Sequence, residues 1–184
     1  MQRRNFLKWS LASVGTTTIP RWAYADAIIS TADSNNKTTS SGLTKQQWRV
    51  LVAIQSHLLP SDKNSPGAQE VHAAIYLHNV LQSPDFDAED RVFVKTGIIQ
   101  IQQLTNQFKK EFYAISPAQR EKLLRQFEST SQGSLWLNMI LEYLMEALLT
   151  DPIYGGNPAG IGWKWLGHTP GAPRPPKHKR YYLL

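Results

Sequence analysis

Glu142 and Glu146 are the residues of this sequence whose type and spacing come closest to a chemical site. Carboxylates four residues apart share one face of a helix, where they can ligate a metal ion or act as general acid and base. The Glu-x-x-His sequence of helical metal sites is missing, and the nearest later histidine is His168. We therefore expect both glutamates to bond backbone groups or to face solvent. The alternative is an independent ligand-binding or enzymatic protein, with a site made of this pair, Tyr154 and His168.

Other signatures of catalysis are absent from the sequence. The five histidines show no HExxH motif and no pair four residues apart, and there is no GxSxG elbow, P-loop or GxGxxG loop. The chain has no cysteine, which excludes a CxxCH haem attachment, a cysteine-ligated zinc ion and an iron–sulfur cluster in this chain. We expect a non-catalytic chain with no cofactor and no metal ion of its own.

The two glutamates lie in the run LWLNMILEYLMEALL, residues 135–149, in which only Asn138 also interrupts the apolar residues. A helix that is apolar on nearly all sides is typical of one surrounded by protein. Fifteen residues with two carboxylates are too few and too polar to span a membrane. We expect this helix at the centre of the domain.

Four amphipathic segments precede that run, and no segment alternates as a strand does. Thr44 with Gln47, and Ser116 with Gln119, fit capping boxes that open helices. The second helix is expected to begin after a cap at Ser65, and the third to start near Asp87. Apolar residues recur at helical intervals after Asp87, which extends the third helix to Phe112. The sequence thus predicts an all-α domain, a small bundle of about five helices over residues 43–150.

Residues 1–25 have the order of an export signal. Paired arginines precede a short apolar stretch and an A-x-A cleavage site, and the start resembles a twin-arginine signal, which carries folded cargo across the bacterial inner membrane. This resemblance implies recognition by the twin-arginine translocase and a periplasmic protein. Residues 26–42 are small and polar and are expected to form a flexible lead. The residues that carry the signal are Arg3, Arg4, Phe6, Leu7, Ala23 and Ala25.

The formal net charge of +6 is concentrated at the two ends of the chain. Residues 1–25 hold four basic side chains and no acid, so removing these four charges leaves +2. The last eleven residues hold another four basic side chains and no acid, which leaves the body between them at about −2. The high isoelectric point is therefore no sign of nucleic-acid binding. The basic end RPPKHKRYYLL could contact a partner or an anionic membrane surface, and a protein held to the membrane by this tail is a third possibility.

The helical pattern stops at Thr150, and residues 151–184 are predicted to form a long irregular arm rich in Gly, Pro and Trp, with a basic tail. Glycines and prolines in DPIYGGN suggest a rigid joint, and tryptophans are typical anchors of interfaces. Packing on the preceding helix is equally compatible with this composition. We expect at least part of the arm to bind a partner. The expected partner-binding residues are Asp151, Pro152, Tyr154, Gly155, Gly156, Asn157, Gly162, Trp163, Trp165, Gly167, Pro170 and Gly171.

The succession of Glu146, DPIYGGN and GIGWKWLGHTPGAP resembles the signature segment of the gluconate 2-dehydrogenase subunit 3 family. GLTKQQWRVLVAI and LLPSDKNSPGAQE also resemble its front half, so the likeness covers roughly residues 43–173. The resemblance implies a non-catalytic small subunit of a membrane-associated sugar or polyol dehydrogenase complex. A large partner subunit would hold FAD and oxidise the substrate, and a multihaem cytochrome c subunit would carry haem c and take the electrons. The small subunit would supply the export signal and support the flavoprotein's maturation and stability.

Overall fold

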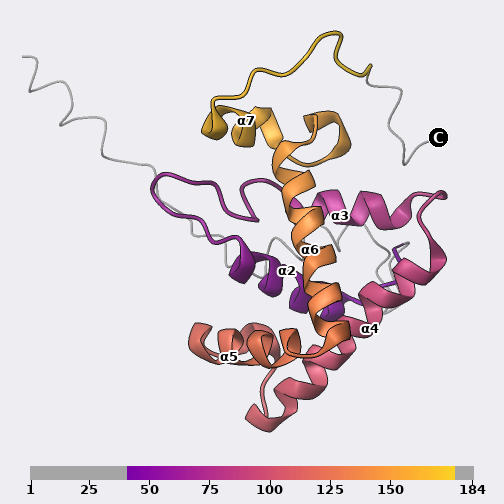
Figure 1. The fold of residues 1–184 in the computed structure, drawn as a ribbon, viewed down its shortest axis with the longest axis vertical. Helices are drawn as coiled ribbons and strands as arrows, with labels where there is room; N and C mark the ends of the chain where they lie inside the picture. The colour runs from indigo at the N-terminus through magenta and orange to yellow at the C-terminus, as the bar shows by residue number, and fades with distance from the viewer. Residues whose placement is uncertain (1–40, 177–184) are drawn as a thin grey trace, which may run out of the picture.

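The computed structural model describes residues 41–176, which fold into helices joined by loops and 3-10 turns, with no strand in that range (Figure 1). The all-α prediction is confirmed. The described part holds one more helix than the five expected, because a short one forms in the C-terminal arm. The helices are α2 (Lys45–Leu58), α3 (Ala73–Gln82), α4 (Ala88–Thr105), α5 (Pro117–Glu128), α6 (Ser131–Leu149) and α7 (Ile161–Leu166). None of these is long and apolar enough to cross a membrane.

Both predicted capping boxes are present at the starts of α2 and α5. The Thr44 hydroxyl accepts from the Gln47 amide at 3.2 Å, and the Gln47 side chain accepts from the Thr44 amide at 2.9 Å. Ser116 and Gln119 repeat this pair of bonds at 3.3 and 2.9 Å. These bonds satisfy amides that have no partner within the helix, which is why so short a sequence signal locates a helix start.

The second helix begins at Ala73, so the predicted start after Ser65 is wrong. The intervening chain turns instead: the Gly67 amide donates to the Glu70 carboxylate at 3.1 Å, and the Ala73 amide donates to the Ala68 carbonyl at 2.9 Å. His72 has a φ of 57°, in the left-handed region. A right-handed helix cannot continue through such a residue, so α3 starts after it.

The third helix starts at the predicted cap but ends earlier than predicted. The Asp87 carboxylate accepts from the Glu89 amide at 2.7 Å. The helix stops at Thr105 and passes into a 3-10 turn, after which Lys109 has a left-handed φ of 51°. Phe112, predicted to lie on this helix, belongs to a separate 3-10 turn (Phe112–Ala114) and is still fully buried. Its apolar periodicity therefore reflected burial in the core and not one continuous helix.

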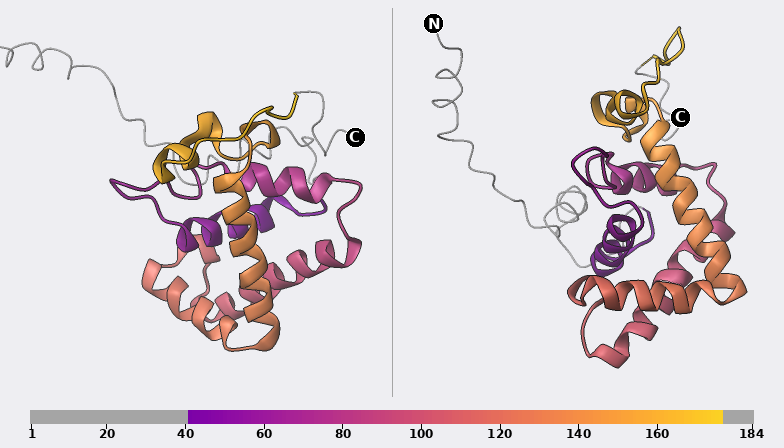
Figure 2. Two further views of the ribbon diagram at one scale, coloured as in Figure 1. Left: turned by 45° about the horizontal axis from the view of Figure 1, so that its top comes forward. Right: turned by 60° about the vertical axis from the view of Figure 1, so that its left-hand side comes forward.

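The helix α6 runs along the long axis of the molecule, with α5 near one end and α7 near the other (Figures 1 and 2). It packs against all five other helices of the described part. Trp136 is fully buried on α6, where its ring nitrogen donates to the Val94 carbonyl of α4 at 3.0 Å. The Phe127 ring of α5 meets the Trp136 ring edge-on at 5.8 Å between centroids. The central position expected for this helix is confirmed.

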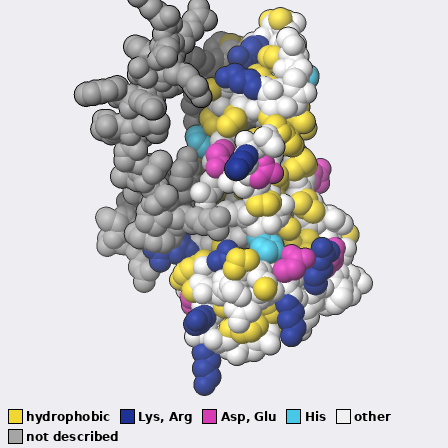
Figure 3. All heavy atoms as spheres, turned by 90° about the vertical axis from the view of Figure 1, so that its left-hand side faces the viewer, with side chains coloured by type: hydrophobic (Ala, Val, Ile, Leu, Met, Phe, Trp, Pro, Cys, Tyr) yellow, Lys and Arg dark blue, Asp and Glu magenta, His cyan; other side chains and the backbone are white. Residues whose placement is uncertain are grey.

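Within residues 41–176, protein covers α6 on one face only, whereas its composition led us to expect protein on nearly all sides. Four large apolar side chains of the opposite face are between 37% and 63% exposed. We call these residues the α6 ridge: Leu135, Leu141, Met145 and Leu149. Figure 3 shows basic side chains near the end of the molecule that carries α7 and a broken band of hydrophobic side chains running away from that end.

The arm after Thr150 is more regular than predicted. It contains two 3-10 turns, Pro152–Tyr154 and Pro158–Gly160, followed by α7. This part folds back across the C-terminal end of α6, whereas residues 167–176 run on without helix (Figure 2).

Candidate functional site

Within the described residues, no third metal ligand joins Glu142 and Glu146. Glu146 accepts a hydrogen bond from the Tyr76 hydroxyl of α3 at 2.8 Å, and Glu142 is exposed. No group of three or more His, Asp or Glu residues that could hold a metal ion occurs within residues 41–176. Burial raises the pKa of Tyr143 to about 12, and the negative charges of Glu146, Asp90 and Glu142 add to this shift. Glu146 is therefore a structural link between two helices, in a locally negative environment.

The other two members of that alternative site have separate contacts. The Tyr154 carbonyl accepts from the Asn79 side chain of α3 at 3.1 Å. The His168 ring lies edge-on to the Trp163 ring, with 6.2 Å between centroids. The structure thus places Tyr154 against α3 and His168 beside α7.

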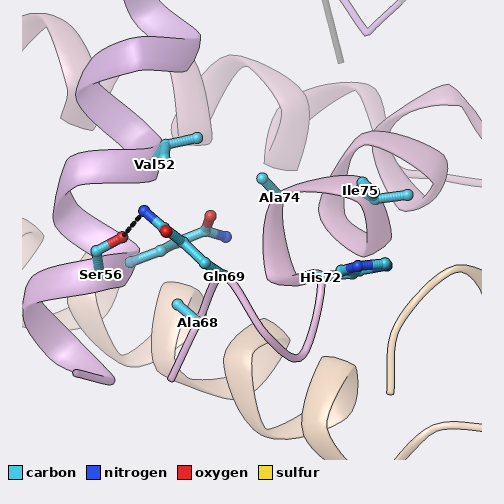
Figure 4. Close-up of a pocket in the computed structure, with 8 residues that line it drawn as sticks. Val52, Ser56, Ala68, Gln69, His72, Ala74 and Ile75 are labelled. Carbon is cyan, nitrogen blue, oxygen red and sulfur yellow. Dashed lines mark hydrogen bonds between the residues drawn. The ribbon is translucent and has the colours of Figure 1, made fainter. Parts of the chain in front are cut away.

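A small cavity between α2 and the start of α3 also fails as a ligand site (Figure 4). Gln69 donates to the Ser56 hydroxyl at 3.5 Å across it. Gln55 is 1% exposed, and its side-chain nitrogen has no hydrogen-bond partner within the described residues. The cavity volume is about 10 Å³. That volume holds at most about one water molecule, which would suit the Gln55 amide.

The segment DPIYGGN begins with Asp151, which makes a tight turn. Its carboxylate accepts from the Ile153 amide at 3.0 Å, and Arg174 donates to both carboxylate oxygens, at 2.7 and 3.0 Å. The Arg174 hydrogen bonds hold the pKa of Asp151 below its ordinary value. The Arg174 guanidinium also lies 5.2 Å from the centre of the Trp163 ring. These contacts fasten the chain beyond α7 to the first residue of the arm.

Asn157 is the most constrained residue of the segment. It is fully buried and has a left-handed φ of 48°. Its side chain donates to the Thr150 carbonyl at 2.9 Å and accepts from the Gly162 amide at 2.7 Å, and its backbone amide donates to the Val71 carbonyl at 2.9 Å. One side chain thus joins the end of α6 to the start of α7.

The glycines allow the arm to lie directly on the backbone of α6. A Cβ atom at Gly162 would lie 2.0 Å from the Leu148 carbonyl oxygen, and one at Gly156 would lie 2.6 Å from the Ala147 carbonyl oxygen. Gly155 has a φ of 96°, a conformation that side chains disfavour. Any larger residue at position 162 would have to displace backbone, so glycine is required there for close approach.

Trp163 completes the packing of the arm onto α6. It is 8% exposed, and its ring nitrogen donates to the Leu149 carbonyl at 2.7 Å. The last carbonyls of a helix have no partner within the helix. Trp163 and Asn157 satisfy two such groups at the end of α6, at Leu149 and Thr150. The first half of the arm is therefore a C-terminal cap for the central helix.

Beyond Trp163 the arm faces outward. Trp165 and Leu166 are 44% and 49% exposed, and Gly167 and Gly171 are exposed as well. Pro170 lies partly buried beside a surface pocket of about 370 Å³ between α7 and the chain that follows it. The twelve residues predicted to bind a partner thus differ in burial. Four are buried (Gly156, Asn157, Gly162 and Trp163), five are half-buried (Asp151, Pro152, Tyr154, Gly155 and Pro170), and three are exposed (Trp165, Gly167 and Gly171).

A family model described as gluconate 2-dehydrogenase subunit 3 matches residues 45–171. The chain belongs to the gluconate 2-dehydrogenase subunit 3 family. No curated protein and no solved structure matches it. Because members of this family are subunits of a multi-subunit dehydrogenase, membership implies a catalytic partner.

The family match runs from the first residue of α2 to Gly171, so it includes the capping segment and α7. Arg174, which fastens the chain after α7, lies beyond the matched residues. Sequence reasoning missed the α6 ridge and the role of Asn157. The excess of apolar residues over what one buried face of α6 requires was the available signal for the ridge. The export-signal residues Arg3, Arg4, Phe6, Leu7, Ala23 and Ala25 lie outside the described residues.

Proposed function

We propose that this member of the gluconate 2-dehydrogenase subunit 3 family is the non-catalytic small subunit of an FAD-dependent sugar, polyol or sugar-acid dehydrogenase. It supports export, maturation and stability of the flavoprotein subunit, which holds FAD and oxidises the substrate. A multihaem cytochrome c is the further subunit that receives the electrons. The observation that carries the proposal is the family match over residues 45–171.

The geometry of the arm supports a binding role for its outer half. Buried contacts of Asn157 and Trp163 fix the position of α7, and α7 presents Trp165 to solvent. A side chain held on a rigid base loses little conformational freedom when it binds, and tryptophan is enriched in interfaces. Residues 152–184 contain five lysines and arginines and no acid, which favours a partner surface with carboxylates.

The paired arginines of residues 1–25 support export of the complex in folded form. A flavoprotein must fold around FAD before it is active, and the twin-arginine route accepts folded cargo. One signal on the small subunit can therefore export both chains after they assemble in the cytoplasm. The location that we propose for the complex is the periplasm, in association with the inner membrane.

Replacing both Arg3 and Arg4 by lysine is expected to keep this chain and the flavoprotein in the cytoplasm. Lysine keeps the charge but lacks the guanidinium fork, so a receptor that recognises arginine is not satisfied. The measurement is fractionation of the natural host, with immunodetection of both subunits and assay of FAD-dependent dehydrogenase activity in each fraction.

Lys8→Arg, the reverse exchange at a position outside the arginine pair, is the control and should leave export intact. The proposal is wrong if the flavoprotein reaches the periplasm in normal amount while the double variant of this chain stays in the cytoplasm. A stoichiometric metal ion or small molecule in the isolated chain would instead favour an independent ligand-binding protein.

A further inference from the structure

The helix α6 has two apolar faces, and only one of them is covered within residues 41–176. The buried face carries residues such as Trp136, Ile140 and Leu144. The α6 ridge lies on the other face and extends from Leu135 to Leu149, about 21 Å at the rise of an α-helix. The outer face of a surface helix is normally polar, but here only Asn138 and Glu142 interrupt the ridge. Within the described residues this apolar face is therefore open to a partner.

We propose that the α6 ridge is the docking surface for the catalytic flavoprotein subunit. The inference rests on the proposed function and specifies which surface performs it. The chain belongs to a family of dehydrogenase subunits, so a catalytic chain is the partner that membership implies. The exposed apolar residues of α6 and α7 together provide the apolar centre that a stable interface needs.

The C-terminal end of the ridge lies beside α7. There, the Leu149 carbonyl accepts the hydrogen bond from Trp163 of α7. The next residues of that helix, Trp165 and Leu166, are both more than 40% exposed. A standard interface covers about 800 Å² on each partner, which is more than a single row of four side chains offers. The ridge and α7 are adjacent and are expected to bind the same subunit.

The charges around the ridge favour a protein surface over a lipid surface. α6 contains no lysine or arginine, and Glu142 lies in the middle of the ridge. Asp90, Glu142 and Glu146 are close enough to Tyr143 to raise its pKa. Helices that lie on membranes carry lysine and arginine beside their apolar face, and anionic lipids would repel the carboxylates of α6. The basic side chains Lys164 and Arg174 lie on the arm, beyond the end of the ridge at Leu149. The matching partner is an apolar groove with lysine or arginine placed near Glu142.

Glu142 also disfavours pairing of the ridge with the ridge of a second copy of this chain. The ridge spans Leu135 to Leu149, and Glu142 stands at its midpoint. A two-fold axis through that midpoint would bring Glu142 against its own copy, because a symmetric interface pairs each surface with itself. Like charges at the centre of an interface are costly. A different protein can place a basic side chain there.

The test replaces Leu141 and Met145 together by glutamate in the full chain. Their side chains are 37% and 40% exposed, and glutamate is a strong helix former, so the helix is expected to persist. The matched control is Val92→Glu with Ile99→Glu, which makes the same chemical change at exposed apolar residues of α4. Each tagged chain is purified from the natural host, and FAD and the flavoprotein are quantified per mole of chain. Circular dichroism checks that the variants are folded.

We expect the wild type and the α4 control to retain the flavoprotein. The amount of flavoprotein per mole of the ridge variant is expected to be about tenfold or more lower than for the wild type, because the new carboxylates would be buried in an apolar interface. A folded ridge variant that retains the flavoprotein as the wild type does would overturn the docking proposal and leave the proposed function intact. A wild type that retains no flavoprotein would contradict the proposed function itself.

Two further readouts assign the ridge to another occupant and overturn the proposal. One is a dimer of the isolated wild-type chain that Met145→Glu dissociates while the flavoprotein still binds. The other is binding to vesicles of anionic lipid that the same change abolishes. If the double variant does not fold, Met145→Glu alone decides the question by the same measurement of retained flavoprotein.

Discussion

Asn157→Ala is expected to lower the free energy of unfolding by about 3–5 kcal/mol. The change leaves the buried Gly162 amide without its partner, at about 1–3 kcal/mol, and the half-buried Thr150 carbonyl without its partner, at about 1 kcal/mol. Alanine also tolerates the left-handed φ of 48° less well than asparagine, which adds about 1 kcal/mol. Urea denaturation followed by circular dichroism measures the loss.

Two comparison variants divide this loss into its causes. Asn157→Gly loses the same side-chain bonds but accepts the backbone conformation, so it is expected to be about 1 kcal/mol more stable than Asn157→Ala. Asn138→Ala, at an exposed position of α6, is expected to change stability by no more than about 0.5 kcal/mol. If Asn157→Ala costs no more than the Asn138 control, Asn157 does not hold the arm on α6.

Gly162→Ala is expected to destabilise the fold by about 3 kcal/mol, because the added methyl group overpacks the contact and moves α7 away from α6. The added Cβ would lie 2.0 Å from the Leu148 carbonyl oxygen, which is backbone and cannot rotate away. Displacing α7 separates Trp163 from the Leu149 carbonyl and exposes its ring. Thermal unfolding measures the loss, and the rise in solvent quenching of tryptophan fluorescence reports the exposure of Trp163.

Gly171→Ala is the matched control, since a Cβ there has no heavy atom within 4 Å and the φ is ordinary. It is expected to be neutral or slightly stabilising, because alanine restricts the unfolded chain. Equal stability of the two variants would show that α7 does not approach α6 as closely as the structure has it.

The parts of the fold that local chemistry decides could be predicted from the sequence. Thr44 and Ser116 each form a capping box with a residue three positions on, so the starts of α2 and α5 were correct. The start of α3 was misplaced because Ser65 and Pro66 give the same local signal, and nothing near them in sequence reveals the left-handed His72. The end of α4 at Thr105 was missed because the apolar periodicity continues past it to Phe112.

Some features of the candidate site could likewise be predicted from the sequence, and others could not. Composition indicated that DPIYGGN forms a rigid joint, and the buried Asn157 accounts for that rigidity. Composition could not indicate which of Trp163 and Trp165 is buried, because both are tryptophans and they lie two residues apart. Their exposed fractions of 8% and 44% depend on which side of α7 meets α6. Apolar periodicity likewise cannot tell a face that the same chain covers from one that a partner must cover, which is why the α6 ridge was missed.

The central claim is that this chain is a non-catalytic subunit bound to a flavoprotein, and purification of the complex tests it most directly. The tagged wild-type chain is purified from the periplasmic and membrane fractions of its natural host, and its FAD content, subunit composition and dehydrogenase activity are measured. The account predicts stoichiometric FAD on a second, larger chain, with all activity on that chain after the two are separated. A monomer without flavin, in a host that still exports an active dehydrogenase when this chain is deleted, would contradict it.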